Sequence, residues 1–213
     1  MSRALCLQCQ RPIKACICAF TAKIDNQIPV VVLQHPSEVK QSKGTVSLLQ
    51  QSLVNCQVIV GEDFGQCQEL SKILKRYGDN IALLYPSEQA LEIDFLTPDI
   101  AEVDCSPDHE KNKRCNLECN IACIIILDGT WKKAYRMFML NQQLHTINHI
   151  VLPQGIPSLY QIRKTKKDNA LSSLEACCHA LARLENSSDK YQELLNNFVK
   201  FNEFQHSFNE HYR

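Results

Sequence analysis

Apolar residues in this chain occur in two patterns, short unbroken runs and segments in which they recur every three or four positions. The runs are rich in β-branched residues and are bounded by turn residues, which is typical of buried strands. They cover residues 28–34, 56–61, 81–86, a run ending at 128, and 147–153. The periodic segments predict helices over residues 43–53, around 70–74, 131–140 and 172–184, with one or two more from residue 190. Alternating strands and helices predict an α/β fold, with a mainly parallel sheet and helices on both faces.

One run differs from the others in how it ends. The aliphatic residues 124–127 are followed by Asp128, Gly129, Thr130 and Trp131, the only tryptophan of the chain. Ligands of parallel α/β sheets bind outside the carboxyl ends of the strands. A carboxylate, a hydroxyl and a large aromatic ring at such an end therefore predict a functional site. The alternative is a turn aspartate followed by a core tryptophan.

Three other predicted strands also end in unusual loops. These loops read His-Pro-Ser-Glu at 35–38, Tyr-Pro-Ser-Glu at 85–88 and Leu-Pro-Gln-Gly at 152–155. In a parallel sheet they would lie at one edge with Asp128 and could share a cleft. The chain has no G-x-G-x-x-G, G-x-x-x-x-G-K-[ST] or G-x-S-x-G motif. This weighs against a dinucleotide-binding enzyme, a P-loop enzyme and a serine hydrolase.

Four cysteines near the N-terminus, Cys6, Cys9, Cys16 and Cys18, have the spacing of a metal knuckle. Zinc accepts four thiolates in a tetrahedron, and such a site replaces a hydrophobic core in a short segment. We expect a structural zinc knuckle over residues 1–24, followed by one catalytic domain over 25–213. With four protein ligands the ion has no open position, so we assign it no catalytic role. Unrelated free thiols are the alternative.

Composition limits the remaining possibilities. No apolar run approaches the ~20 residues that span a bilayer, and the first residues lack a signal-peptide core, so we expect a cytoplasmic protein without a membrane partner. No obligate protein partner is evident. The polar stretch 97–120 carries three cysteines, for which free thiols in a surface loop are favoured over a second metal site.

Formal charge is balanced, at 23 basic and 23 acidic residues, which by itself gives no support to a nucleic-acid partner. Basic residues nevertheless cluster in two places, at 132–136 and 163–167. Beside a cleft, such clusters suit a phosphate backbone. A solvated loop is the alternative, and it is the commoner explanation of charge runs.

Taken together, these segments resemble the DTW-domain family. The resemblance rests on an ordered set of motifs: the four-cysteine knuckle, His35-Pro36-x-Glu38, residues 85–88, Asp128-Gly129-Thr130-Trp131, Leu152-Pro153, Ser158-x-Tyr160-x2-Arg163-Lys164, and residues 171–176. It implies a tRNA-uridine aminocarboxypropyltransferase. Such an enzyme moves the 3-amino-3-carboxypropyl group of S-adenosylmethionine to N3 of a tRNA uridine and leaves methylthioadenosine. The resemblance also implies a SPOUT-like core with a C-terminal trefoil knot. Ser173 stands where the family often has threonine.

The implied reaction suggests roles for the motif residues. Uridine N3 must lose its proton before it attacks, and Asp128 is our candidate general base, with helix capping or turn formation as the alternative. Cofactor contacts are expected from Leu127, Gly129, Thr130, Leu152, Gly155, Ser158, Tyr160, Ser172 and Glu175. Contacts to the RNA substrate are expected from His35, Glu38, Trp131, Lys132, Arg136, Arg163 and Lys164. Ser172 and Glu175 fit a helix-capping box equally well.

Two other functions remain open at this point. A SPOUT-type RNA methyltransferase would use the same cofactor but release S-adenosylhomocysteine. A non-catalytic, zinc-containing RNA-binding protein would bind tRNA and modify nothing.

Overall fold

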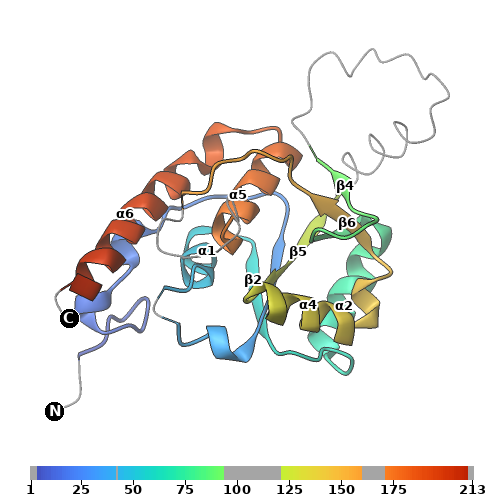
Figure 1. The fold of residues 1–213 in the computed structure, drawn as a ribbon, viewed down its shortest axis with the longest axis horizontal. Helices are drawn as coiled ribbons and strands as arrows, with labels where there is room; N and C mark the ends of the chain where they lie inside the picture. Colours follow the sequence, from blue (N-terminus) through green and yellow to red (C-terminus); the bar gives the residue numbers. More distant parts are fainter. Residues whose placement is uncertain (1–3, 42, 94–120, 160–170, 211–213) are drawn as a thin grey trace.

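The computed structural model describes residues 4–41, 43–93, 121–159 and 171–210. Its centre is a six-stranded sheet with the order β2-β1-β5-β3-β6-β4, drawn in Figure 1. All neighbouring strands of this sheet run parallel. The strands are β1 (Val30–Gln34), β2 (Cys56–Val60), β3 (Ile81–Leu84), β4 (Leu91–Glu92), β5 (Cys123–Asp128) and β6 (Asn148–Val151). The prediction of a mainly parallel α/β sheet is confirmed.

α-Helices lie between β1 and β2, between β2 and β3 and between β5 and β6, and two more follow β6. The α-helices are α1 (Val46–Ser52), α2 (Gln68–Tyr77), α4 (Trp131–Leu140), α5 (Ser173–Leu184) and α6 (Gln192–Glu210). Short 3-10 helices cover Ile13–Ala15, Cys18–Phe20, Pro36–Glu38, Gly78–Asn80, Gln142–Leu144 and Asp189–Tyr191. The sequence pattern predicted both ends of α4 correctly. It did not predict β4, which is only two residues long.

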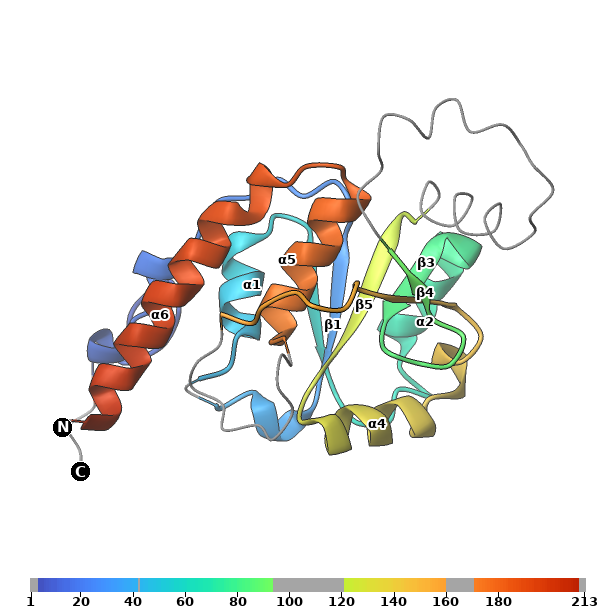
Figure 2. The same ribbon diagram turned by 45° about the horizontal axis from the view of Figure 1, so that its top comes forward.

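The helices cover both faces of the sheet, as expected (Figure 2). In β1, Val30 and Val32 pack with α1, α5 and α6, whereas Val31 and Leu33 pack with α2 and α4. Every residue of β1 and β5 is buried, because strands of a parallel sheet are covered on both sides. This explains why both strands appear as continuous aliphatic runs. None of the described helices is long and apolar enough to cross a membrane.

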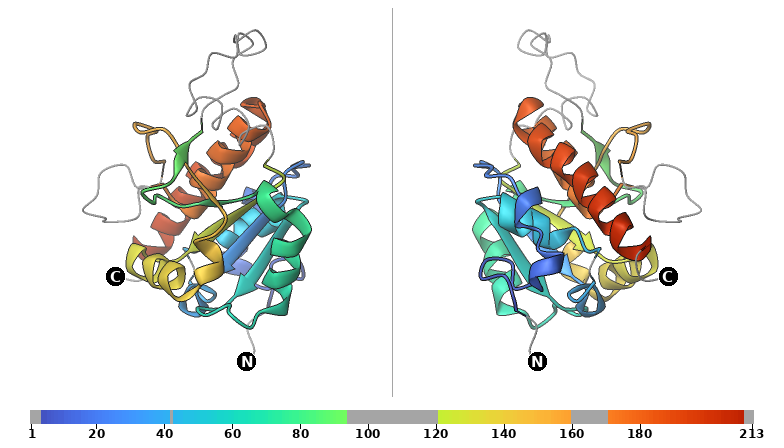
Figure 3. Two further views of the ribbon diagram at one scale, coloured as in Figure 1. Left: turned by 90° about the vertical axis from the view of Figure 1, so that its right-hand side faces the viewer. Right: turned by 90° about the vertical axis from the view of Figure 1, so that its left-hand side faces the viewer.

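The N-terminal segment packs along α6, as the right-hand view of Figure 3 shows. The Phe20 ring lies 5.8 Å from the Phe201 ring and 5.1 Å from the Phe204 ring, centroid to centroid. Ile17 is fully buried in the same core as α6. The expected domain boundary after residue 24 stays a prediction.

Two further predictions concern residues that the structure does not describe. The expected free thiols of the 97–120 loop lie outside the described residues, as does the chain path through 160–170, so the trefoil knot stays a prediction. Cys123 is buried in β5, and Cys177 and Cys178 are buried in α5.

Candidate active site

The carboxyl ends of β1, β5 and β3 lie at the same edge of the sheet. In the parallel register Gln34 is paired with Asp128, and Leu84 is paired with Ile126. The backbone N–H of His35 donates to the Asp128 carbonyl at 3.0 Å, which joins the loops after β1 and β5. The loop after β6 lies there too, because β6 is paired in parallel with β3. The structure therefore brings all four unusual loops to one edge of the sheet, where the sequence pattern placed them.

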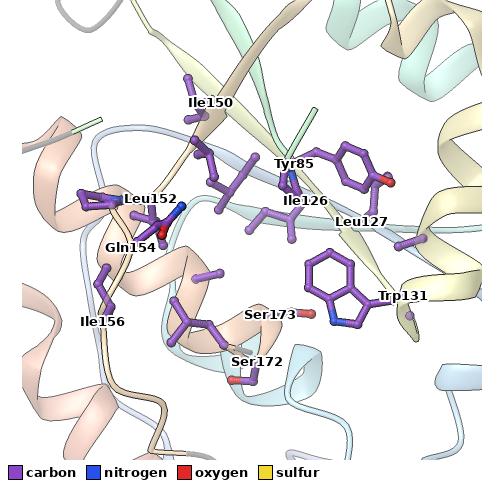
Figure 4. Close-up of a pocket in the computed structure, with 18 of the residues that line it drawn as sticks. Tyr85, Ile126, Leu127, Trp131, Ile150, Leu152, Gln154, Ile156, Ser172 and Ser173 are labelled. Atoms are coloured by element: carbon purple, nitrogen blue, oxygen red, sulfur yellow. The ribbon is translucent and has the colours of Figure 1, made fainter. Parts of the chain in front are cut away.

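A cavity of about 450 Å³ opens at this edge, drawn in Figure 4. That volume is within the usual range for small-molecule sites. The walls come from the ends of β3, β5 and β6, the β6–α5 loop and the first turn of α5. The lining residues are Leu84–Pro86, Ile126, Leu127, Gly129, Trp131, Ala134, Ile150–Ile156, Leu171–Ser173 and Ala176. Of the residues expected to contact the cofactor, Leu127, Gly129, Leu152, Gly155 and Ser172 line it.

Asp128 lies beside this cavity, between the lining residues Leu127 and Gly129, and its carboxylate is held from two sides. The residue is 7% exposed. Its Oδ2 accepts a hydrogen bond from Gln34 Nε2 at 3.0 Å, and its Oδ1 accepts one from Ser173 Oγ at 2.7 Å. Both neighbours of Asp128 in the chain line the cavity, and so does Ser173. The carboxylate thus has a fixed orientation, which helix capping alone does not require.

Sequence reasoning did not assign Gln34 or Ser173 to the site. Gln34 could have been found from strand register, because it ends β1 directly beside Asp128. Ser173 follows the N-cap Ser172 and was noted only as a departure from the family pattern. Its contact with Asp128 joins residues 45 positions apart, and nothing in the local pattern indicates that contact.

Gly129 and Thr130 form the tight connection from β5 into α4. A Cβ atom on Gly129 would lie 3.1 Å from the Lys133 Cβ and 3.7 Å from the His35 Cβ, so glycine permits a close approach here. The exposed Thr130 is the N-cap of α4, and its hydroxyl accepts from the Lys133 N–H at 3.4 Å. Thr130 therefore has a capping role in the structure, and cofactor contact by this residue stays a prediction.

Trp131 is the first residue of α4 and lines the cavity (Figure 4). It is 50% exposed, so the alternative of a packed core tryptophan is wrong. Tyr85 also lines the wall, and its ring stacks on that of Phe138 with 4.7 Å between the centroids. Burial raises the pKa of Tyr85, and the nearby Tyr135 hydroxyl raises it further. Two aromatic rings thus border the cavity.

Two ion pairs join α4 to the loops that follow β1 and β2. Lys133 Nζ lies 2.7 Å from Glu38 Oε1, and Arg136 Nε lies 2.9 Å from Glu62 Oε1. The Nε2 atom of His35 lies 3.5 Å from the same Glu62 oxygen. Glu62 follows β2 and was not predicted as a site residue.

The remaining expected RNA contacts divide into one exposed residue and two that are not described. Lys132 is exposed. Arg163 and Lys164 lie outside the described residues, as does Tyr160, an expected cofactor contact.

Glu175 is fully buried and accepts hydrogen bonds from three groups. With Ser172 it forms a complete capping box: Ser172 Oγ accepts from the Glu175 N–H at 3.2 Å, and Glu175 Oε2 accepts from the Ser172 N–H at 2.7 Å. The other donors are Ser158 Oγ and the Leu159 N–H. The capping alternative is confirmed, and in addition Glu175 ties residues 158–159 to the start of α5. Cofactor contact by Ser158, Ser172 and Glu175 stays a prediction.

The four N-terminal cysteine sulfurs lie within 4.8 Å of one another. Individual Sγ–Sγ distances are 3.5 Å for Cys6–Cys16, 3.7 Å for Cys6–Cys18 and 3.8 Å for Cys9–Cys16. Zn–S bonds of ~2.3 Å in a tetrahedron require sulfur–sulfur edges of about 3.8 Å. A disulfide would bring two sulfurs to about 2 Å, so the cluster has the dimensions of a metal site.

The surroundings of the cysteine sulfurs also suit a cation. The backbone N–H groups of Cys9 and Gln8 donate to the Cys6 sulfur and lower its pKa to about 6. Burial raises the pKa of Cys18 to about 12, and the neighbouring cysteines add to this. Four thiolates packed this closely repel one another, and a divalent cation removes that repulsion. The cluster could hold zinc, as expected.

Comparison with known proteins agrees with these features. The DTW-domain family model matches residues 3–206. A Macaca fascicularis protein named tRNA-uridine aminocarboxypropyltransferase 2 is 31% identical over 199 residues, covering 91% of this chain and 60% of the relative. Proteins of the same name from Mus musculus and Drosophila melanogaster are 27% and 28% identical, each covering 91% of this chain, and 60% and 71% of the relative. The chain spans about 60% of the length of the first two relatives. No solved structure matches it significantly.

Proposed function

Because the chain belongs to the DTW-domain family, we propose that it is a tRNA-uridine aminocarboxypropyltransferase. It transfers the 3-amino-3-carboxypropyl group of S-adenosylmethionine to N3 of a tRNA uridine and releases methylthioadenosine. The observation that carries the proposal is the Asp128 carboxylate, fixed by Gln34 and Ser173 beside a cavity of suitable size. The names of the relatives supply the substrate class.

The residues around Asp128 suit removal of the uridine N3 proton. Ser173 lies between the carboxylate and the cavity, since its Oγ donates to Asp128 and the residue lines the cavity. A uridine N–H placed at the cavity would reach Asp128 directly or through the Ser173 hydroxyl, which would pass its own proton to the carboxylate as it accepts the one from N3. Both routes leave N3 deprotonated and nucleophilic.

The cavity suits an S-adenosylmethionine donor in size and in lining. Its wall is mostly aliphatic and aromatic, with backbone groups of Leu127, Leu152 and Gly155 available for adenosine. Gly155 has a φ of +90°, a conformation that favours glycine and lets the loop turn at the cavity. When bound, the donor supplies an activated sulfonium leaving group. The protein's part is to orient the donor, exclude water and hold the N3 proton.

The remaining parts of the proposal follow the family resemblance. The knuckle cysteines Cys6, Cys9, Cys16 and Cys18 hold a structural zinc. The core is SPOUT-like, with a C-terminal trefoil knot. The protein acts on tRNA in the cytoplasm.

The decisive experiment analyses the products of one reaction. Purified protein is incubated with S-adenosylmethionine and tRNA, and both the small-molecule product and the digested tRNA nucleosides are analysed by mass spectrometry. Methylthioadenosine and an aminocarboxypropyl adduct on uridine are expected. S-adenosylhomocysteine with a methylated nucleoside would replace the proposal with an RNA methyltransferase. Tight tRNA binding with unchanged nucleosides, both in vitro and in cells lacking the protein, would indicate a non-catalytic RNA-binding protein.

A further inference from the structure

The outer face of α4 carries three exposed apolar side chains in one row. Trp131, Tyr135 and Met139 are 50%, 58% and 51% exposed and are spaced four residues apart. Residues at this spacing share one face of a helix. The opposite face, with Ala134 and Met137, is buried against the sheet. We call the row of Trp131, Tyr135 and Met139 the α4 stripe.

The charges of α4 all have one sign. Lys132, Lys133 and Arg136 lie in its first two turns, and the helix contains no acidic residue. Cations near a helix N-terminus are unfavourable to the helix dipole, so helix stability does not explain them. Lys133 and Arg136 are partly neutralised by Glu38 and Glu62. Lys132 is exposed and forms no ion pair with the residues that the structure describes.

The α4 stripe begins at the cavity. Trp131 belongs both to the stripe and to the cavity wall, as Figure 4 shows. Tyr135, one turn further along, lies close enough to Tyr85 of the cavity wall to raise the pKa of that phenol. A polymer whose reacting unit enters the cavity would therefore have its neighbouring units above α4.

We propose that the α4 stripe binds single-stranded RNA beside the target uridine, with bases stacking on Trp131 and Tyr135 and a phosphate contacting Lys132. This rests on the proposed function. Aromatic rings alternating with cations on an exposed surface form the usual platform for unpaired nucleotides, because every base has a π-face and every nucleotide a negative charge. The binding would hold an unpaired segment whose uridine can turn into the cavity.

A second copy of the chain fits this surface less well. In a two-fold symmetric dimer the same surface patch contacts itself. Pairing α4 with α4 would bring two sets of three cations together without an acidic residue on either helix. An RNA strand, in contrast, gains from the same charges.

Trp131 is itself the reporter for the test, since it is the only tryptophan in the chain. The full chain is titrated with a uridine-containing single-stranded oligoribonucleotide and with tRNA, and indole fluorescence is followed without added donor. A saturable change in emission is expected. Tyr135→Ala should weaken binding about five- to tenfold, and Tyr135→Phe should restore most of it, because the stacking surface is retained. Lys132→Ala should weaken binding and reduce the salt dependence by about one counterion.

Lys72→Ala, which removes an exposed cation from α2, is the matched control and should bind RNA like the wild type. The proposal is wrong if Tyr135→Ala and Lys132→Ala bind RNA with wild-type affinity and salt dependence. It is also wrong if sedimentation shows a dimer that Tyr135→Ala dissociates. Because the titration needs no turnover, absence of group transfer with intact stripe-dependent RNA binding would overturn only the proposed function. If Tyr135→Ala and Lys132→Ala both transfer the group with the wild-type KM for tRNA, only the proposed RNA binding by the α4 stripe would be overturned.

Discussion

Asp128 has more fixed hydrogen-bond partners than a turn aspartate needs. Gln34 comes from β1 and Ser173 from α5, so three separate elements converge on one carboxylate. A base held this way does not need to reorganise when its substrate binds, which favours proton transfer. At the scale of the residue, this convergence is the strongest argument for chemistry at the end of β5.

The first prediction concerns the charge of this carboxylate. Asp128→Asn keeps the shape of the side chain and should lower kcat by about 10²–10⁴-fold, since the amide cannot take the uridine proton. The Gln34 amide and the Ser173 hydroxyl can each turn an acceptor toward the new amide, so the unfolding midpoint and the affinity for S-adenosylmethionine should change little by comparison. Activity is measured as methylthioadenosine release. Asp63→Asn, in an exposed turn, is the control and should behave like the wild type. Near-normal activity of Asp128→Asn would leave Asp128 as a structural residue.

A second prediction separates the hydroxyl of Ser173 from its bulk. Ser173→Ala removes a hydrogen bond to a charged group and should reduce kcat by about ten- to a hundredfold, the equivalent of ~1.5–3 kcal/mol. Ser173→Thr keeps the hydroxyl and should retain most of the activity. Methylthioadenosine release, measured for both variants, should fall only for alanine, because only alanine removes a hydrogen-bond donor from Asp128. Equal kcat values for the two variants would contradict this role.

The limits of sequence reasoning are clear at these same residues. Asp128, Trp131 and the cavity-lining loops were found because each follows an aliphatic run and strand ends are where parallel sheets bind ligands. Gln34, Ser173 and Glu62 were missed because their roles depend on which strands become neighbours. β5 lies between β1 and β3 in the sheet although it is the fifth strand in the chain. Local periodicity carries no information about that order.

At the scale of elements, the start of α5 shows how a buried charge shapes the site. The Glu175 carboxylate is fully buried and accepts from Ser172, Ser158 and Leu159. It therefore joins the cap of α5 to the segment that follows β6. The sequence pattern identified the capping box, which is local, but could not show that the same carboxylate also holds residues 158–159.

The third prediction follows from these three hydrogen-bond donors. Glu175→Gln replaces one accepting oxygen with an NH₂ group that faces buried donors, and each unsatisfied donor costs about 1–3 kcal/mol. We expect a fall of ~2 kcal/mol or more in the free energy of unfolding, and a lower melting temperature by about 4–8 °C. The affinity for S-adenosylmethionine should fall as well, because Glu175 holds the β6–α5 loop and this loop lines the cavity.

Calorimetry measures the loss of stability, and titration with S-adenosylmethionine measures the loss of cofactor affinity. Glu193→Gln, an exposed carboxylate in the first turn of α6, is the matched control and should change neither quantity by much. A Glu175→Gln variant as stable as the wild type would mean that the capping box contributes nothing measurable.

At the scale of the whole molecule, the cysteine knuckle and the cavity belong to different parts of the fold. The knuckle is fixed to α1, where Arg11 Nη2 donates to Ser47 Oγ at 2.8 Å, and to α6 through Phe20. The cavity lies at the edge formed by β3, β5 and β6. A structural ion in the knuckle should therefore act on stability and leave the chemistry of the cavity unchanged.

The fourth prediction tests that separation. Elemental analysis should find one zinc per chain, and Cys6→Ser together with Cys9→Ser should abolish it. Because ion binding contributes directly to folding, the double variant should melt at a lower temperature, and chelator should lower the melting temperature of the wild type but not of the variant. Below its melting temperature, the folded fraction should retain its kcat for transfer. Cys67→Ser is the control, since Cys67 caps α2 outside the cluster and serine preserves the cap. A selective loss of kcat with an unchanged melting temperature would give the ion a catalytic role. Four thiolate ligands fill the coordination sphere of zinc and leave no open position, which argues against that outcome.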